Sequence, residues 1–317
     1  MKVIYAAGRD KLKYKKPFLA IGVFDGVHRG HQMLIHQVVR KARATGGTSV
    51  VMTFDPHPVH VLHPEIACPL LVSVPHRLKL MEALGVDVCV VIRFTKKFSY
   101  LTPEQFIQDY LVKRIHPQEV FLGDDFRFGQ NRSGDLDFFQ EAARQYGFKV
   151  NIFSAVKFSK ERISSTCIRK LITDGETLAA SRLLGRRVSV LGKVVQGDSR
   201  GRELGFPTAN LECDCDPLIP PGVYLVYVVL DKKIFKGIAN IGFRPSFYKK
   251  KAEKILFEVH ILDFNKNIYG REIVVEIIQK LRDEKKFLAP EALIAQIKAD
   301  EIKARKYFQT QSRSRQR

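Results

Sequence analysis

Short hydrophobic runs alternate with helix-like segments in the first half of the chain. Thr102, Pro103 and Gln105 have the spacing of a helix start with a capping box, and Gly85 is a suitable stop for a helix over 73–85. This alternation is typical of a parallel sheet covered by helices, so an α/β fold is predicted here. The predicted strands are FLAIGVF (18–24), SVVMTF (49–54), VDVCVVIRF (86–94), EVFLG (119–123) and KVNIFS (149–154).

The rhythm changes after residues 183–187. Short apolar runs then follow one another with turn signals and without helical patterns between them, which predicts a C-terminal antiparallel β-barrel. A terminal helix opened by Pro290 is expected to close this part. The runs are RVSVLGKVV (187–195), GVYLVYVVL (222–230), KIFKGIANI (233–241), ILFEVHILDF (255–264) and EIVVEIIQKL (272–281).

Composition adds a strong positive charge to this picture. The 53 lysines and arginines exceed the 33 acidic residues by 20 in a chain of 317 residues, which favours polyanions such as nucleotides or nucleic acid. No run approaches the roughly 20 apolar residues of a membrane helix, and the N-terminus lacks the core of a signal peptide. The five cysteines include no CxxC pair. We therefore expect a cytoplasmic protein with reduced thiols and no membrane partner.

The stretch GVFDGVHRGH, 22–31, joins a predicted strand to a predicted helix through a glycine-rich turn. Gly22, Gly26 and Gly30 make the turn flexible, and a helix start presents free N–H groups to an anion. His28 and His31 are three residues apart and can lie on one side of the helix start, donating to phosphate oxygens. Zinc binding is the competing use, although no third ligand has a suitable spacing; ordinary surface histidines are the other.

A second glycine-rich stretch, GDSRGRELGFPTANL, occupies 197–211. Its glycines allow the backbone to approach phosphates, its arginines add charge, and Thr208 and Asn210 supply oxygen ligands that magnesium prefers. A basic hairpin loop is the alternative interpretation. The predicted nucleotide loop consists of Gly197, Arg200, Gly201, Arg202, Gly205 and Pro207.

Several motifs in order resemble one known family. The stretch at 22–31 is similar to the signature of HxGH nucleotidyltransferases, and TFDPHP (53–58), GDDFRFGQNRSGD (123–135) and ISSTCIR (163–169) follow it. Together with Pro-Thr-Ala-Asn (207–210), GIANIGFRPSF and FEVHILDF, they resemble the bacterial bifunctional riboflavin kinase/FAD synthetases. The resemblance extends from about Phe18 to Phe308. It implies a Rossmann-like nucleotidyltransferase unit followed by a riboflavin kinase barrel.

For the first half, the resemblance implies transfer of an adenylyl group from ATP to FMN, giving FAD and pyrophosphate. His28 and His31 would hold the ATP phosphates, and Asp125 would help to place magnesium. Asp55, His57 and Arg127 would serve the nucleotide or flavin, although TFDPHP could equally be a proline-rich turn. The remaining implied ATP ligands are Gly22, Phe24, Asp25, Gly26, Gly30, Ser164, Ser165, Thr166 and Arg169, of which one hydroxyl could instead be an ordinary N-cap.

For the second half, the resemblance implies phosphorylation of riboflavin to FMN, with Thr208 and Asn210 holding magnesium and the ATP phosphates. Strand alternation places Glu258 on the face opposite to Phe257, where a carboxylate is ordinarily just solvated. The resemblance instead makes Glu258 the general base.

The flavin-side loop of this kinase would include Asn240 and Arg244. Ser246 stands where the family pattern has threonine, and residues 263–270 lack an expected Gly-Asp.

These inferences define the predicted organisation. Residues 1–184 form an FMN adenylyltransferase domain, 185–310 a riboflavin kinase domain, and 311–317 a basic disordered tail. ATP, riboflavin and FMN are substrates, FMN and FAD are products, and Mg²⁺ is the cofactor. The alternatives are a chain that retains one activity and a basic nucleic-acid-binding protein, although no nucleic-acid module is visible. The oligomeric state stays open and includes a homo-oligomer.

Overall fold

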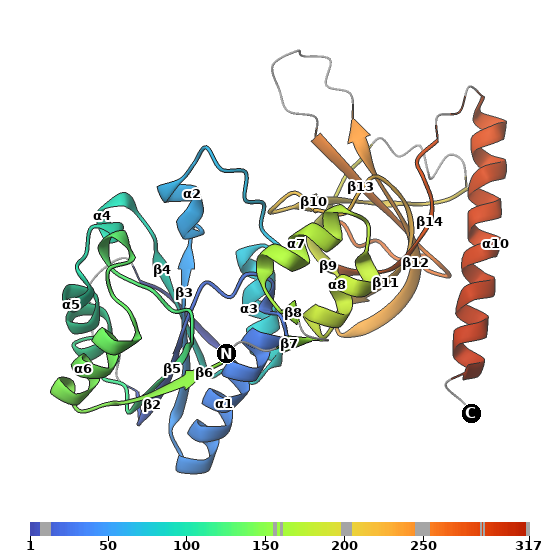
Figure 1. Ribbon diagram of the computed structural model, residues 1–317. Coiled ribbons are helices and arrows are strands. Elements are labelled where there is room, and N and C mark those ends of the chain that lie inside the picture. The colour runs from blue at the N-terminus through green and yellow to red at the C-terminus, as the bar shows by residue number, and fades with distance from the viewer. Residues whose placement is uncertain are drawn as a thin grey trace. The chain divides into compact units, whose positions relative to one another are not determined.

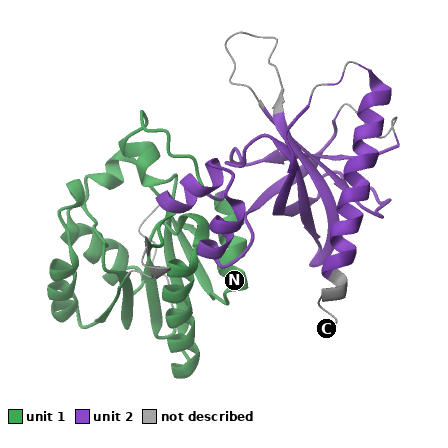
Figure 2. Cartoon of the chain, turned by 45° about the vertical axis from the view of Figure 1, so that its right-hand side comes forward, with its two compact units in different colours: residues 1–70, 74–165 green, residues 71–73, 166–317 purple. Residues whose placement is uncertain are grey.

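The computed structural model describes residues 1–6, 14–154, 157–158, 161–197, 205–244, 254–285, 287 and 289–314. The chain forms two compact units, coloured separately in Figure 2: Met1–Leu70 with Val74–Ser165, and Leu71–Ser73 with Thr166–Arg317. The division falls after Ser165, the first residue of helix α7 (Ser165–Thr173), which is followed by α8 (Thr177–Leu184). The boundary expected after residue 184 stays a prediction.

The first unit contains a six-stranded parallel sheet with the order β1-β4-β3-β2-β5-β6 (Figure 1). The predicted parallel α/β architecture is confirmed, and all five predicted strands are present. The edge strand β1 was not predicted, because its short run in the N-terminal segment carries no turn signals. The strands are β1 (Lys2–Ala6), β2 (Pro17–Ile21), β3 (Thr48–Asp55), β4 (Val88–Arg93), β5 (Glu119–Gly123) and β6 (Lys149–Phe153).

Both faces of this sheet are buried, as expected for a parallel sheet covered by helices. On β2, Phe18 and Ala20 join one core cluster, whereas Leu19 and Ile21 join the other. Helices α1 and α3 supply the first cluster, and α6 supplies the second. The helices are α1 (Arg29–Thr45), α2 (Pro58–Leu62), α3 (Val74–Ala83), α4 (Lys96–Ser99), α5 (Pro103–Phe106) and α6 (Leu136–Tyr146), with 3-10 turns η1 (Asp25–Val27) and η3 (Gln130–Arg132) and a short hairpin of β7 (Lys157–Phe158) and β8 (Glu161–Arg162).

The helix expected over 102–114 differs in its second half. Its capping box is confirmed, because Thr102 and Gln105 bond each other's backbone N–H, but the α-helix ends at Phe106 and a π-helix, η2 (Ile107–Val112), follows. Phe106 and Leu111, five residues apart, both belong to the second core cluster. The wider π turn suits this spacing.

The second unit contains a closed antiparallel barrel with the order β10-β13-β12-β11-β14-β9, as predicted. Five of its strands were predicted from their apolar runs. The sixth, β10, lies in the segment interpreted only as a nucleotide loop. The strands are β9 (Ser189–Val195), β10 (Ala209–Cys213), β11 (Gly222–Leu230), β12 (Lys233–Arg244), β13 (Lys254–Ile261) and β14 (Glu272–Arg282).

The terminal helix α10 (Pro290–Ser314) packs on the outside of the barrel. Ala304 and Phe308 are buried against Val223, Leu225 and Ile238. Because α10 continues to Ser314, the disordered tail predicted for 311–317 is wrong for its first four residues, and 315–317 lie outside the described residues. The tail contains no glycine or proline that would stop the helix.

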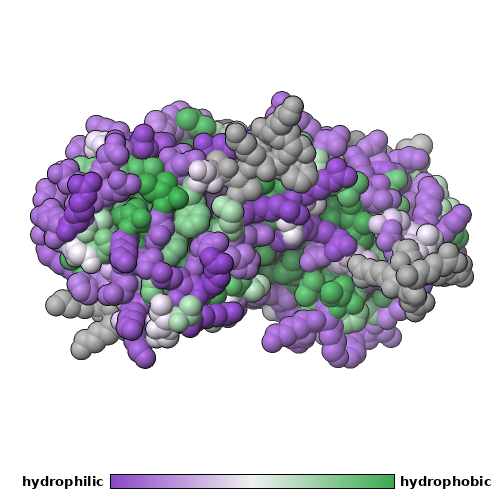
Figure 3. Space-filling model, turned by 60° about the horizontal axis from the view of Figure 1, so that its bottom comes forward, coloured by the Kyte–Doolittle hydropathy of each residue, from purple (hydrophilic) through white to green (hydrophobic). Residues whose placement is uncertain are grey.

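The surface is mixed in character. On the face drawn in Figure 3, hydrophobic residues are interspersed with hydrophilic ones. None of the helices in the described part of the chain combines the length and apolar character that crossing a membrane requires.

Candidate active sites

A pocket of about 340 Å³ lies in the first unit, where β2 and β5 end. This volume is within the range of small-molecule sites. The structure therefore brings together predicted residues from four separate sequence motifs. Those lining the pocket are Gly22, Phe24, Asp25, His28, Gly30, His31, His57, Asp125, Ser164 and Ser165.

His28 and His31 are stacked at the start of α1, with ring centroids 3.5 Å apart and planes inclined by 19°. His28 is the N-cap, and its Nδ1 accepts a bond from the backbone N–H of His31 at 3.4 Å. In the neutral ring this acceptor role places the proton on Nε2, which makes Nε2 the donor nitrogen of the ring. Phe24 packs edge-on against His31 at 5.2 Å. The predicted placement of both imidazoles on one side of the helix start is confirmed.

The backbone before these histidines is fixed by a buried arginine. Arg77 of α3 is 0% exposed and donates to the carbonyl of Val23 and, at 3.0 Å, to Oγ1 of Thr53. Thr53 Oγ1 itself donates to the carbonyl of Val23 at 2.9 Å. This network holds the turn that leads into the pocket. The sequence did not reveal Arg77, because an arginine in an ordinary helical pattern gives no sign that it is buried.

Ser164 and Ser165 lie at the C-terminal end of the first unit, and Ser165 contacts the same turn. Ser165 Oγ donates to the carbonyl of Asp25 at 3.0 Å, although the two residues are 140 positions apart. Ser165 is also the first residue of α7, so it lies at the positive end of that helix dipole. Thr166 and Arg169 lie on α7 and belong to the second compact unit. Their approach to the pocket stays a prediction.

Asp125 lies at the pocket and is paired with a cation. Arg162 of β8 lies 2.7 Å from Asp125 Oδ2 and 3.2 Å from Asp124 Oδ1, and all three residues line the pocket. A magnesium ion at Asp125 would therefore compete with Arg162. Sequence reasoning missed Arg162 and Asp124, although they adjoin motifs that it used.

Other predicted residues do not line this pocket. Gly26 is buried in η1 with a φ of 79°, a left-handed conformation that glycine adopts readily and that shapes the turn. Asp55 ends β3 and Arg127 is exposed, with its guanidinium bonded to the carbonyl of Phe126 at 3.2 Å. Any contact of Asp55 or Arg127 with a nucleotide or flavin stays a prediction.

A second pocket lies in the barrel unit and is lined by Gly197, Pro207, Thr208 and Asn210 together with residues 264–269. The structure thus groups the predicted Pro-Thr-Ala-Asn segment with the loop after β13. Gly205 is described but does not line the pocket, whereas Arg200, Gly201 and Arg202 lie outside the described residues.

Glu258 stands in a row of polar residues across three strands. On β13 it lies directly opposite Asn210 of β10 and Asn240 of β12. Directly opposed residues of antiparallel strands project to the same face with Cβ atoms about 5 Å apart. Phe257 and Val259 beside it are buried, whereas Glu258 is half-buried. Three residues predicted for metal, base and flavin therefore share one face, while Arg244 ends β12 and its side chain is not described.

Comparison with known proteins identifies two family models that match successive parts of the chain. The family model described as FAD synthetase matches residues 11–167, and the one described as riboflavin kinase matches residues 184–308. A bifunctional riboflavin kinase/FMN adenylyltransferase of Escherichia coli is 38% identical over 92% of each chain. Relatives with the same description from Listeria monocytogenes and Bacillus subtilis are 40% and 35% identical, covering 92% and 94% of each chain, respectively.

A solved structure extends this likeness to the fold of the whole chain. A crystal structure described as a macrolide-efflux protein from Streptococcus pneumoniae matches with a TM-score of 0.82 and 31% identity, covering 96% of this chain and 99% of the other. Both family models match in the order in which the two units occur along the sequence. The chain belongs to the family of bifunctional riboflavin kinase/FMN adenylyltransferases.

Proposed function

We propose that the barrel unit phosphorylates riboflavin to FMN with ATP and that the first unit adenylylates FMN to FAD. The observation that carries this proposal is the presence of two separate pockets in one chain, each lined by residues that suit a nucleotide. The family supports both activities in the same order. Free thiols at all five cysteines suit the proposed location in the reducing cytoplasm.

In the first pocket, the residues position two substrates rather than react with them. A phosphate oxygen of FMN attacks the α-phosphorus of ATP, the bond to the β-phosphate oxygen breaks, and pyrophosphate leaves. His28 and His31 would donate to the phosphates from one side. The helix start at Ser165 and the guanidinium of Arg162 would neutralise charge on the leaving group. Catalysis here is in-line placement and charge stabilisation.

In the barrel, Glu258 would accept the proton of the terminal ribityl hydroxyl as its oxygen attacks the γ-phosphorus of ATP, and ADP leaves. Asn240, opposite Glu258 on the adjacent strand, would orient the flavin side. Thr208 and Asn210 would contact the phosphate end at the pocket.

Magnesium is the metal that this chemistry implies, and the barrel pocket fits it. The hydroxyl of Thr208 and the amide oxygen of Asn210 are half-buried hard ligands at the pocket wall. Among the residues that the structure describes, no three His, Cys, Asp or Glu side chains gather as a metal site. This suits an ion that keeps several waters and is held largely by substrate phosphates. When bound, it would neutralise developing phosphate charge.

The direct test is incubation of the purified protein with riboflavin, ATP and MgCl₂, with flavins separated over time. We expect FMN to appear first and FAD to follow. FMN that accumulates without FAD would refute the proposal for the first unit, and unchanged riboflavin would refute that for the barrel. A parallel reaction with EDTA in excess over the metal should stop both steps.

A further inference from the structure

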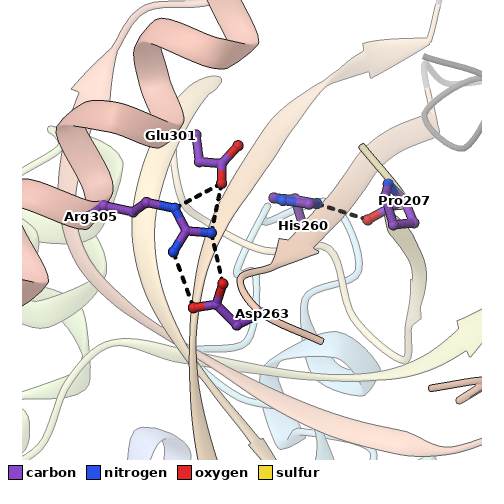
Figure 4. Close-up of polar contacts among 5 residues, drawn as sticks. All are labelled: Pro207, His260, Asp263, Glu301 and Arg305. Carbon is purple, nitrogen blue, oxygen red and sulfur yellow. Dashed lines mark hydrogen bonds and ion pairs between the residues drawn. The ribbon is translucent and has the colours of Figure 1, made fainter. Parts of the chain in front are cut away.

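The segment that carries Thr208 and Asn210 is attached to β13 by a side chain as well as by strand pairing. The β10–β13 ladder pairs Ala209 with Val259 and Asn210 with Glu258. Pro207 and Thr208 precede β10. At this point Nδ1 of His260 lies 2.9 Å from the carbonyl oxygen of Pro207 (Figure 4).

The geometry specifies the chemistry of this contact. A carbonyl oxygen can only accept, so Nδ1 of His260 carries the proton and donates it. The imidazole is also packed edge-on to the buried ring of Phe206, with centroids 6.0 Å apart and planes at 76°. His260 therefore holds the backbone of residues 206–207 directly before the predicted metal ligand Thr208.

The position of His260 connects this contact with the reacting end of the site. His260 is two residues after Glu258, so both side chains project from the same face of β13. His260 therefore lies on the same face as the row formed by Asn210, Glu258 and Asn240, next to Glu258 along β13. A displacement of Pro207 would move the Thr208 hydroxyl relative to the Glu258 carboxylate.

Residues 264–269, which also line this pocket, have a separate anchor on α10. Arg305 of α10 holds Asp263 with bonds of 2.8 and 3.1 Å and Glu301 with a bond of 2.9 Å (Figure 4). Asp263 directly precedes the wall formed by residues 264–269. The two walls are therefore fixed by different contacts.

We propose that His260 is a positioning residue of the kinase site: its Nδ1–H bond to Pro207 sets Thr208 and Asn210 for the metal-bound phosphates of ATP. The inference rests on the proposed kinase function of the barrel. His260 does not take part in proton transfer, which is assigned to Glu258.

The test compares three variants of the full chain. In His260→Asn the amide nitrogen can occupy the position of Nδ1, in His260→Gln it reaches toward the position of Nε2, and in His260→Leu no donor remains. FMN formation is measured at varied MgATP, at varied free Mg²⁺ and at varied riboflavin. FAD formation from added FMN reports the intact first unit in each variant.

We expect His260→Leu and His260→Gln to raise the KM for MgATP and the Mg²⁺ needed for half-activation by about 5- to 10-fold, the effect of one lost hydrogen bond. The KM for riboflavin should stay within about twofold, and His260→Asn should recover most of the loss. A purely structural role would lower the active fraction and hence the apparent kcat, with KM unchanged.

Three results would overturn this inference alone: an unchanged KM for MgATP in His260→Gln, a His260→Asn variant as impaired as His260→Gln, or a loss confined to kcat. If His260→Leu does not fold, the pair of polar variants decides the question. A wild-type protein that forms no FMN would overturn the kinase function and this inference with it.

Discussion

The backbone of Gly197 lies against the side chain of Asn210: a Cβ at residue 197 would be 2.1 Å from Nδ2 and 2.4 Å from Cγ of Asn210. Such a separation is shorter than any van der Waals contact, so another residue at 197 must displace the amide. Glycine allows the backbone to approach the amide this closely. It keeps Asn210 in its place at the pocket wall.

Gly197→Ala is therefore expected to impair the kinase step. Moving the Asn210 amide should lower kcat/KM for MgATP in riboflavin phosphorylation by about tenfold or more, since small misplacements at a site of phosphoryl transfer are costly. The same protein should adenylylate added FMN at the wild-type rate, which serves as the internal control. Equal kinase activity in Gly197→Ala and wild type would show that Asn210 does not act from the position described.

His28→Ala tests the first pocket. We proposed that His28 donates to the ATP phosphates, and removal of such a preorganised donor should reduce FAD formation by about 100-fold or more, whereas FMN formation should be retained. The two steps are followed in one assay by separating riboflavin, FMN and FAD. Because His28 also caps α1, His28→Asn is the matched variant: it can keep the cap and still lacks the imidazole Nε2. An active His28→Asn would assign the histidine to capping alone.

Glu258→Gln tests the barrel in the opposite sense. The amide keeps the size of the side chain but cannot accept the hydroxyl proton, so riboflavin phosphorylation should fall by about 100-fold or more. Adenylylation of supplied FMN should be unaffected. A parallel change of Glu272, an exposed residue on β14, to glutamine should leave both rates unchanged. If Glu258→Gln abolished both steps in a folded protein, the assignment of activities to units would be wrong.

Much of this arrangement was accessible from the sequence because local patterns encode it. The buried strands of both units follow from apolar runs, and the pairing of His28 with His31 follows from helical spacing. β10 was missed since its residues Ala209–Cys213 have a chemical motif and only weak strand alternation.

The features of the two sites that the sequence did not predict depend on tertiary contacts. Arg77 and Arg162 contact residues 54 and 37 positions away along the chain, respectively, and no local pattern reports such contacts. The alignment of Glu258 with Asn210 and Asn240 is likewise set by strand register, which alternation within one strand does not fix.

The cysteines provide a prediction about pH. Burial raises the pKa of the Cys89 and Cys213 thiols to about 12, so at pH 8 both are protonated and poor nucleophiles. In native protein treated with iodoacetamide at pH 8, both should be alkylated far more slowly than after unfolding in guanidinium, where their pKa values return to about 8.5. Peptide mass spectrometry gives the extent at each site. Modification of Cys213 at equal rates in the two states would contradict the raised pKa of its thiol in the folded protein.

The attachment of α10 to the barrel gives a prediction about stability. Phe308 is 2% exposed and lies between Tyr227 and Tyr307, with ring centroids 5.6 Å from each. Removing a buried aromatic ring leaves a cavity and costs about 3–5 kcal/mol of unfolding free energy. Phe308→Ala should therefore shift the unfolding transition of the barrel unit to a lower denaturant concentration while leaving that of the first unit unchanged.

Because two units need not unfold together, the transitions are followed separately, by loss of FMN formation and of FAD formation after incubation in urea. The exposed Ile302 on the same helix, 68% exposed, is the matched control, and Ile302→Ala should leave both transitions unchanged within about 0.5 kcal/mol. Coincident shifts of both transitions in Phe308→Ala would show instead that the two units unfold as one.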